Sequence, residues 1–185
     1  DRSDIVCSVL NGGVLSDNKG VNVPGVKLSM PYISEVDESD IRFAAQENFD
    51  FVAASFVTCA DDVLEVRRAM DALCVELACD RITPEELQDL KKACDTFEAA
   101  VKTDDIKQIA QADVALHDII VQATGNQRLI QLVNNLSEQM YRYRFEYIKD
   151  FSQHERLVEE HKVIYESIVK KDKETASNMA KVHID

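Results

Sequence analysis

The sequence lacks any apolar run that approaches the ~20 residues a transmembrane helix needs, so no membrane span is expected. It is also poor in basic residues: 21 Lys and Arg stand against 34 Asp and Glu, for a formal net charge of −13. DNA binding draws its affinity from clustered Lys and Arg, so we expect no DNA binding by this chain alone. The five cysteines form no CxxC pair and indicate reduced, mostly buried thiols of a cytoplasmic protein.

Glycine and proline are scarce and gather at one end, with four of five glycines and two of three prolines within the first 31 residues. The sequence there predicts extended runs at 4–10 and 14–23, a helix from Ser34 to about residue 48, and a buried strand at 51–57. This order predicts a small α/β fragment over residues 1–60. Because the chain starts with Asp and has no signal peptide, we expect a piece of a longer protein.

From residue 61 onward the pattern is helical, which makes the fold mainly α. Thr83 before Pro84 predicts a capped helix start, Gly125 a left-handed helix end, and Ser152 a second capping box. The helices are expected at about 61–79, 84–101, 103–125, 126–150, from 152 through His161, and 173–183. Such helices with short loops predict an antiparallel six-helix bundle over residues 61–185.

The last part of the helix predicted at 126–150 carries four aromatic residues that are too dense for one helical stripe: Tyr141, Tyr143, Phe145 and Tyr147. Some of these rings must face a second surface. Ordinary core and rim packing explains them as well as a homodimer contact does.

Four residues predict a transition-metal site. Asp113 and His117 are four apart and share one helical face, while His161 and His183 lie eleven residues either side of Asp172, in a polar turn. Two antiparallel helices joined there would place both imidazoles at one level. The plainer interpretation is four surface or singly satisfied core residues. The remaining histidine, His154, is expected to be exposed or to lie just behind the ligands.

Consecutive blocks of the first 68 residues resemble pyruvate kinase. The blocks are Asn11-Gly12-Gly13, Asp17 to Gly25, Ser34-Glu35-Val36-Asp37 and Asp50 to Val57. In that family they run from the lid domain into the catalytic barrel. The family's Lys-Ile-Glu-Asn segment, with its catalytic lysine and metal-binding glutamate, is missing, and a barrel needs eight strands. The resemblance therefore implies a fragment without kinase activity.

Residues 61–185 resemble the FCD effector domain of GntR-family transcription regulators. The resemblance is carried by residues 62–67, Leu77-Ala78, residues 81–87, Asp113 with His117, Ala123-Thr124-Gly125-Asn126, Glu160-His161 and His183. The two resemblances meet within residues 61–68, as at a crossover between two genes.

The FCD resemblance implies a divalent ion held by Asp113, His117, His161 and His183. A carboxylate with three imidazoles suits Zn²⁺, Ni²⁺ or Mn²⁺ and leaves positions open. The resemblance also implies a small carboxylate effector, with Arg67 and Asn126 as binding candidates. For Arg67 alone, a surface salt bridge with a neighbouring acid such as Asp71 is the competing explanation.

The leading hypothesis is a metal-dependent, carboxylate-sensing effector domain that lacks its winged helix-turn-helix in this chain and is not an enzyme. The alternative is a non-catalytic pyruvate kinase fragment fused to a helical domain. A metalloenzyme is disfavoured because the sequence has no Glu-x-x-His pairs for a di-iron site, and Asp118 points about 100° away from His117 around the helix.

Overall fold

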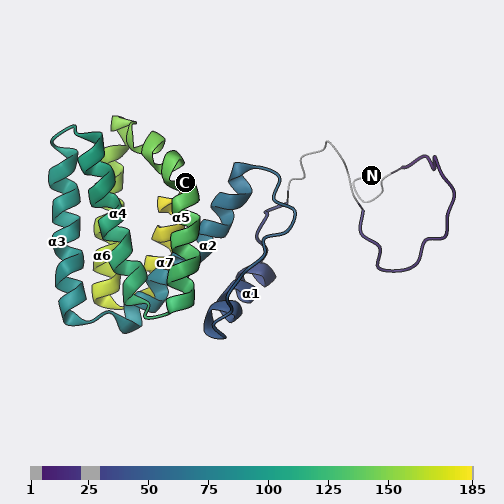
Figure 1. Ribbon diagram of the computed structural model, residues 1–185, viewed down its shortest axis with the longest axis horizontal. Coiled ribbons are helices and arrows are strands. Elements are labelled where there is room, and N and C mark those ends of the chain that lie inside the picture. The colour runs from purple at the N-terminus through teal and green to yellow at the C-terminus, as the bar shows by residue number, and fades with distance from the viewer. Residues whose placement is uncertain (1–5, 22–29, 185) are drawn as a thin grey trace. The chain divides into compact units, whose positions relative to one another are not determined.

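The computed structural model describes residues 6–21 and 30–184, apart from the side chains of 139–144. Its contacts divide the chain into two compact units, Asp1–Met30 and Pro31–Asp185. The described residues of the first unit are exposed and contain neither helix nor strand. The second unit begins well before the domain boundary predicted between residues 60 and 61, because a helix from the kinase-like part packs with the rest (Figure 1).

The helix predicted after Ser34 is present as α1 (Glu35–Gln46). The Ser34 hydroxyl accepts a hydrogen bond from the backbone N–H of Asp37, whose carboxylate accepts from the Ser34 N–H at 2.8 Å. This reciprocal capping box satisfies donors that a helix start would otherwise leave unpaired. The apolar residues Ile41 and Ala45 are buried against the remainder of the unit.

The strand predicted at 51–57 is wrong. These residues are irregular, with Phe51 and Phe56 exposed at 86% and 85% and Phe56 in a left-handed conformation. A strand is stable only when neighbouring strands pair its backbone N–H and C=O groups. The parts of the two earlier predicted runs that lie at 6–10 and 14–21 are not strands either. Residues 4–5 and 22–23 of those runs lie outside the described residues.

The region from residue 60 is helical, at bounds close to those predicted. Its elements are α2 (Ala60–Arg81), α3 (Pro84–Val101), α4 (Ile106–Ala123), α5 (Gln127–Ile148), the 3₁₀ turn η1 (Phe151–Gln153), α6 (His154–Lys170) and α7 (Lys173–His183). The described part of the chain is therefore mainly α. None of its helices is both long and apolar enough to cross a membrane.

Two of the three predicted helix-end signals are confirmed. Thr83 accepts from the backbone of the third residue of α3, and Gly125 takes a φ of +60° after α4. The capping box at Ser152 is wrong. Asp150 accepts the Ser152 N–H at 3.0 Å and starts η1 instead, so that α6 begins at His154 without a capping side chain. The Asp150 carboxylate, which comes earlier in the chain, thus takes the place of the cap predicted at Ser152.

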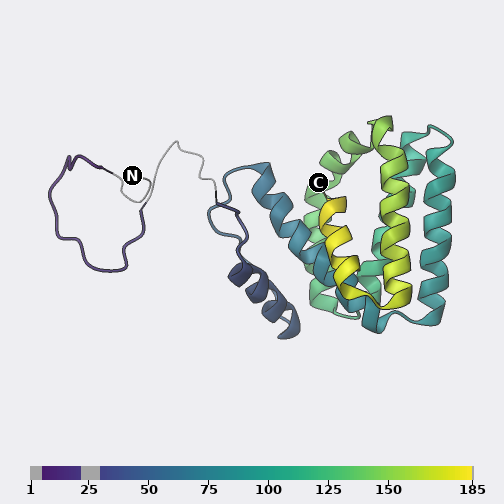
Figure 2. The same cartoon turned by 180° about the vertical axis from the view of Figure 1, so that it is seen from behind.

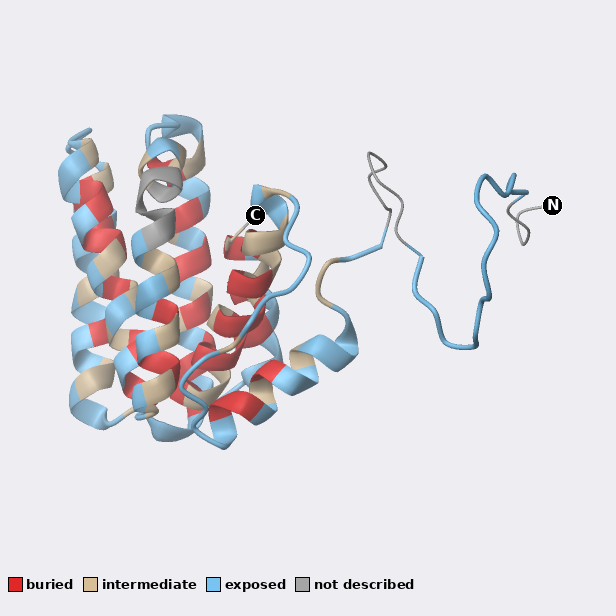
Figure 3. Cartoon of the chain, turned by 45° about the vertical axis from the view of Figure 1, so that its right-hand side comes forward, coloured by how far each residue is buried: buried red, intermediate tan, exposed pale blue. Residues whose placement is uncertain are grey.

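The core is organised around α2, which contacts α1, α4, α5, α6 and α7 (Figures 1 and 2). Buried residues of these helices form the larger of two apolar clusters, in which Leu73, Leu116 and Ile164 are almost fully enclosed. A smaller cluster around Phe97 and Ile109 joins α3, α4, α5 and α6. Figure 3 shows the buried faces of the helices turned toward one another.

The described part of the aromatic patch packs inward. Phe145 and Tyr147 are partly buried against the smaller cluster, and the Tyr147 hydroxyl accepts a hydrogen bond from Arg156 at 2.6 Å. Tyr141 and Tyr143 are among the side chains outside the described set. Rim packing accounts for the first two rings, and the homodimer contact stays a prediction.

The cysteines are free thiols, but the prediction that most are buried is wrong. Cys74 and Cys79 on α2 are buried, whereas Cys59 and Cys94 are half-buried and Cys7 is exposed. Burial raises the pKa of the Cys94 thiol to about 11 and raises that of Cys79 as well. These thiols are therefore protonated near neutral pH.

Candidate metal centre

Helix α4 supplies two of the four predicted ligands. Asp105 caps its start by accepting the backbone N–H groups of Lys107 and Gln108. From there the helical repeat turns Asp113 and His117 to one face, one turn apart. The Asp113 carboxylate is 4% exposed and its Oδ1 lies 3.7 Å from His117 Nε2.

The other two predicted ligands come from α6 and α7, and the turn between these helices sets their height. Lys171 takes a left-handed φ of +56° after α6, and Asp172 caps α7 by accepting the Thr175 N–H. The predicted antiparallel pair therefore forms. His161 and His183 meet at the same level, with their Nε2 atoms 3.3 Å apart.

All four side chains converge, and their ligand atoms lie within 4.8 Å of one another. His183 Nε2 is 3.1 Å from His117 Nε2, and Asp113 Oδ1 is 3.4 Å from His161 Nε2. Nitrogen ligands held at the usual 2.0–2.1 Å from zinc in a tetrahedron would be about 3.4 Å apart. The donor set and its spacing therefore fit a transition-metal ion.

The aromatic ring of Phe97 closes one side of the cluster. Phe97 is fully buried and meets the His161 ring edge-on, with their centroids 4.5 Å apart. His161 itself is only 1% exposed. Such packing fixes the imidazole and excludes water from one side of the donor atoms.

A buried acid that the sequence did not single out as functional orients His183. Glu160 Oε2 lies 2.9 Å from His183 Nδ1, and its Oε1 accepts from Arg156 Nε at 3.0 Å. A carboxylate only accepts hydrogen bonds, so His183 donates from Nδ1 and directs the lone pair of Nε2 into the cluster. The spacing of Arg156 and Glu160, one turn apart on α6, predicts their ion pair but not the contact of Glu160 with His183.

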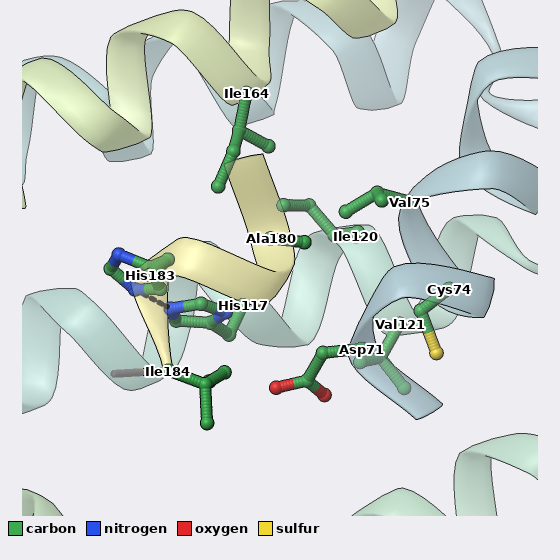
Figure 4. A pocket seen from close by; sticks show the side chains of 10 residues that line it. All are labelled: Asp71, Cys74, Val75, His117, Ile120, Val121, Ile164, Ala180, His183 and Ile184. Carbon is green, nitrogen blue, oxygen red and sulfur yellow. Dashed lines mark hydrogen bonds between the residues drawn. The ribbon is translucent and has the colours of Figure 1, made fainter. Parts of the chain in front are cut away.

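Two cavities border the cluster. The Asp71 cavity, lined by Asp71, Cys74, His117 and His183 among others, encloses about 310 Å³ including its open mouth (Figure 4). Burial, and next the negative charge of Asp71, raise the pKa of the Cys74 thiol well above its usual value. A protonated thiol is a poor metal ligand, so the imidazoles dominate the donor set.

The Arg67 cavity lies on the Asp113 side. Arg67, Asp113, His183 and Tyr147 line it, and it encloses about 440 Å³ including its mouth. Arg67 also donates from Nε to Asp71 Oδ2 at 3.1 Å. The expected salt bridge thus exists, but the prediction that it lies at the surface is wrong, because the Arg67 side chain is only 7% exposed.

The structure separates Asn126 and His154 from the cluster. Asn126 caps α5, and its Nδ2 donates to the Ala45 carbonyl at 2.6 Å; it lines neither of the two cavities. His154 is buried and donates from Nε2 to the Ile148 carbonyl at 2.8 Å. The prediction of an exposed His154 is therefore wrong, because the first turn of α6 packs against the end of α5.

The fold is mainly helical and encloses a buried carboxylate–histidine cluster, which is the class of protein that the sequence resemblance predicted. The FCD domain family model matches residues 62–185. The chain therefore belongs to the FCD domain family. The structure of E. coli McbR/YncC is similar, with a TM-score of 0.62 and 18% identity over 80% of this chain and 74% of that one. At that identity the likeness shows the fold.

Part of the chain is similar to pyruvate kinases, as the resemblance of the first 68 residues predicted. It is 56% identical to the Geobacillus stearothermophilus enzyme over 69 residues, which cover 37% of this chain and 12% of the enzyme. It is 50% identical to the Staphylococcus aureus COL enzyme over 70 residues, covering 38% and 12%. The chain thus spans about an eighth of the length of these kinases.

Proposed function

We propose that residues 62–185 are the effector domain of a GntR-type transcription regulator, which senses a small carboxylate with the help of a bound divalent transition metal. The observation that carries this proposal is the convergence of Asp113, His117, His161 and His183 within 4.8 Å. These residues would hold Zn²⁺, Ni²⁺ or Mn²⁺, and the ion would supply a Lewis-acidic centre for one oxygen of the effector.

The Arg67 cavity supports a carboxylate as the effector. Its lining joins a guanidinium to two of the proposed ligands, Asp113 and His183. A guanidinium recognises a carboxylate by paired, charge-assisted hydrogen bonds, and burial strengthens these. Binding would favour one packing of the helices, and in the intact regulator this difference would reach the DNA-binding domains. A homodimer is part of the same proposal.

Elemental analysis of protein purified without chelator tests the metal. We expect about one equivalent of Zn, Ni or Mn per chain in the wild type, and loss of that metal in His161→Ala. His154→Ala is the matched control, since it removes a buried histidine outside the cluster. No metal in the wild type, even after loading with each ion, would refute the metal-dependent sensor.

A thermal-shift screen of small mono- and dicarboxylates on the metal-loaded protein tests the effector. We expect a hit to lose affinity in Arg67→Lys, which keeps the charge but not the planar fork of donors. Metal content should stay at the wild-type value in this variant and serves as the internal control. A carboxylate that binds both proteins equally would remove Arg67 from the effector site. Asn126→Ala tests the second predicted contact in the same assay.

The similarity to pyruvate kinases favours a second candidate, a kinase fragment without activity fused to the helical domain. The similar segment covers only 12% of the Geobacillus enzyme. We therefore expect no ATP formation from phosphoenolpyruvate and ADP. Activity that rises in proportion to the concentration of this protein would contradict the proposal that the chain is not an enzyme.

A further inference from the structure

One face of α1 is built to lie on the bundle. Glu38, Ile41, Arg42 and Ala45 follow at spacings of three, one and three residues and therefore share a single stripe of the helix. Ile41 and Ala45 are 7% and 3% exposed and belong to the larger apolar cluster. The opposite face carries Val36, which is 69% exposed. Helix α1 is thus amphipathic, with its apolar stripe already covered.

Charged side chains flank the apolar stripe and join three helices. Arg42 of α1 forms a paired salt bridge with Glu76 of α2, whose second hydrogen bond measures 2.8 Å, and donates to Glu38 at 3.1 Å. Both Glu38 oxygens accept from Lys181 of α7, at 3.1 and 3.2 Å. Glu76 also accepts a hydrogen bond from the side chain of Ser177, on the same helix as Lys181.

The pattern of charge on the receiving surface is specific. Glu76 on α2 faces the cation of α1, and Lys181 on α7 faces its anion. A helix docked in the opposite direction would bring like charges together, which disfavours that orientation. The surface therefore suits an amphipathic helix with an acid and an arginine one turn apart and apolar residues between and beyond them.

The salt bridge between Glu38 and Lys181 ties α1 to the end of α7. Lys181 lies two residues before His183, in the final turn of α7, which is 11 residues long. The last turn of a helix lacks partners for its carbonyl groups, and helix ends open first in local unfolding. The salt bridge from α1 restrains the turn that carries His183.

We propose that α2 and α7 form a docking surface for an amphipathic helix, occupied here by α1, and that the docked helix positions the His183 end of α7 for metal binding. The metal part rests on the proposed function, whereas the docking and positioning part does not. Because coupling between two binding events is reciprocal, docking strengthens metal binding and the metal strengthens docking.

Two pairs of variants of the full chain test the proposal. Glu38→Gln removes the charge that holds Lys181, and Asp40→Asn makes the same kind of change at an exposed position of α1. Ile41→Asp places a charge in the buried stripe, and Val36→Asp places it on the outer face. The two readouts are amide hydrogen exchange of residues 178–184 in metal-free protein and the Kd for Zn²⁺ by competition with a chelating dye.

We expect faster exchange at the end of α7 in Glu38→Gln and Ile41→Asp than in their controls. The Zn²⁺ Kd should rise about two- to fivefold in Glu38→Gln, as for a partly exposed ion pair, and further in Ile41→Asp. Unchanged exchange in Ile41→Asp would overturn the proposal whether or not metal binds. Faster exchange with an unchanged Kd would overturn the link to the metal centre. Faster exchange in a protein that binds no Zn²⁺ would support the docking surface and refute the metal sensor, so the two proposals fail separately.

Discussion

Replacing Glu160 with glutamine tests how the chain prepares His183. The Glu160 side chain is 8% exposed, and its two oxygens are divided between His183 Nδ1 at 2.9 Å and Arg156 Nε at 3.0 Å. In Glu160→Gln, Arg156 would still donate to the side-chain oxygen, because a guanidinium only donates hydrogen bonds. The amide NH₂ would then face His183 and favour the tautomer that carries its proton on Nε2.

That tautomer is the wrong one for the cluster, because a protonated Nε2 has no lone pair for a metal. Changes to groups that orient a metal-bound histidine usually weaken metal binding by about 10- to 100-fold. This corresponds to about 1.4–2.7 kcal/mol. The competition from Arg156 for the amide oxygen predicts a value in the upper part of this range for Glu160→Gln.

Competition titration of Zn²⁺ against a chelating dye measures the effect. Glu159→Gln is the matched control, since it removes the same charge from the neighbouring, exposed position of α6. Circular dichroism of both metal-free variants checks that the fold is retained. A Zn²⁺ Kd in Glu160→Gln within twofold of that in Glu159→Gln would show that the buried acid does not orient His183.

Three further measurements address the fold around the site. Phe97→Ala should lower the free energy of unfolding by about 3–5 kcal/mol in urea titrations, because the ring is fully buried. Asn126→Ala removes a helix cap and the bond to Ala45, and should lower it by about 1 kcal/mol. Burial raises the pKa of Glu76, but the hydrogen bonds from Arg42 and Ser177 and the positive charges of Arg42 and Lys181 together outweigh it, so the pKa lies below its ordinary 4.5. The stability that Glu76 contributes is therefore complete above pH 4.5 and is lost as the pH falls through the lowered pKa, so the difference in unfolding free energy between wild type and Glu76→Gln should shrink in urea titrations on acidification.

Local signals predicted the helices and the convergence of the four proposed ligands well. The helical repeat alone predicts that Asp113 and His117 share one face. The turn at Lys171 and the equal lengths of α6 and α7 between that turn and each histidine predict that His161 and His183 lie at the same height. These features depend on residues close together in the sequence. The predicted capping box at Ser152 failed because the carboxylate of Asp150, two residues earlier, accepts the backbone N–H of Ser152.

Features that depend on the packing of distant helices could not be predicted in the same way. Nothing in the pattern around Glu160 indicates that it reaches His183, which is 23 residues further along the chain. The burial of His154 follows from the end of α5, where it bonds the Ile148 carbonyl. Arg67 was predicted either to bind the effector carboxylate or to form a surface salt bridge; it forms a buried salt bridge with Asp71 and also lines the Arg67 cavity.

The kinase-like segment contains one element that forms from local interactions, the helix α1, and one run that needs partners from elsewhere in a sheet, residues 51–57. The hydrogen bonds of α1 run within the helix and its cap is Ser34, so the element forms wherever its apolar stripe finds a partner, here α2. The run at 51–57 needs neighbouring strands to pair with, and no described residue of this chain forms one. High identity over 69 residues is thus compatible with the absence of strands from the part of this segment that the structure describes. In this chain α1 packs on α2 and forms an ion pair with Lys181 of α7, the helix that bears His183.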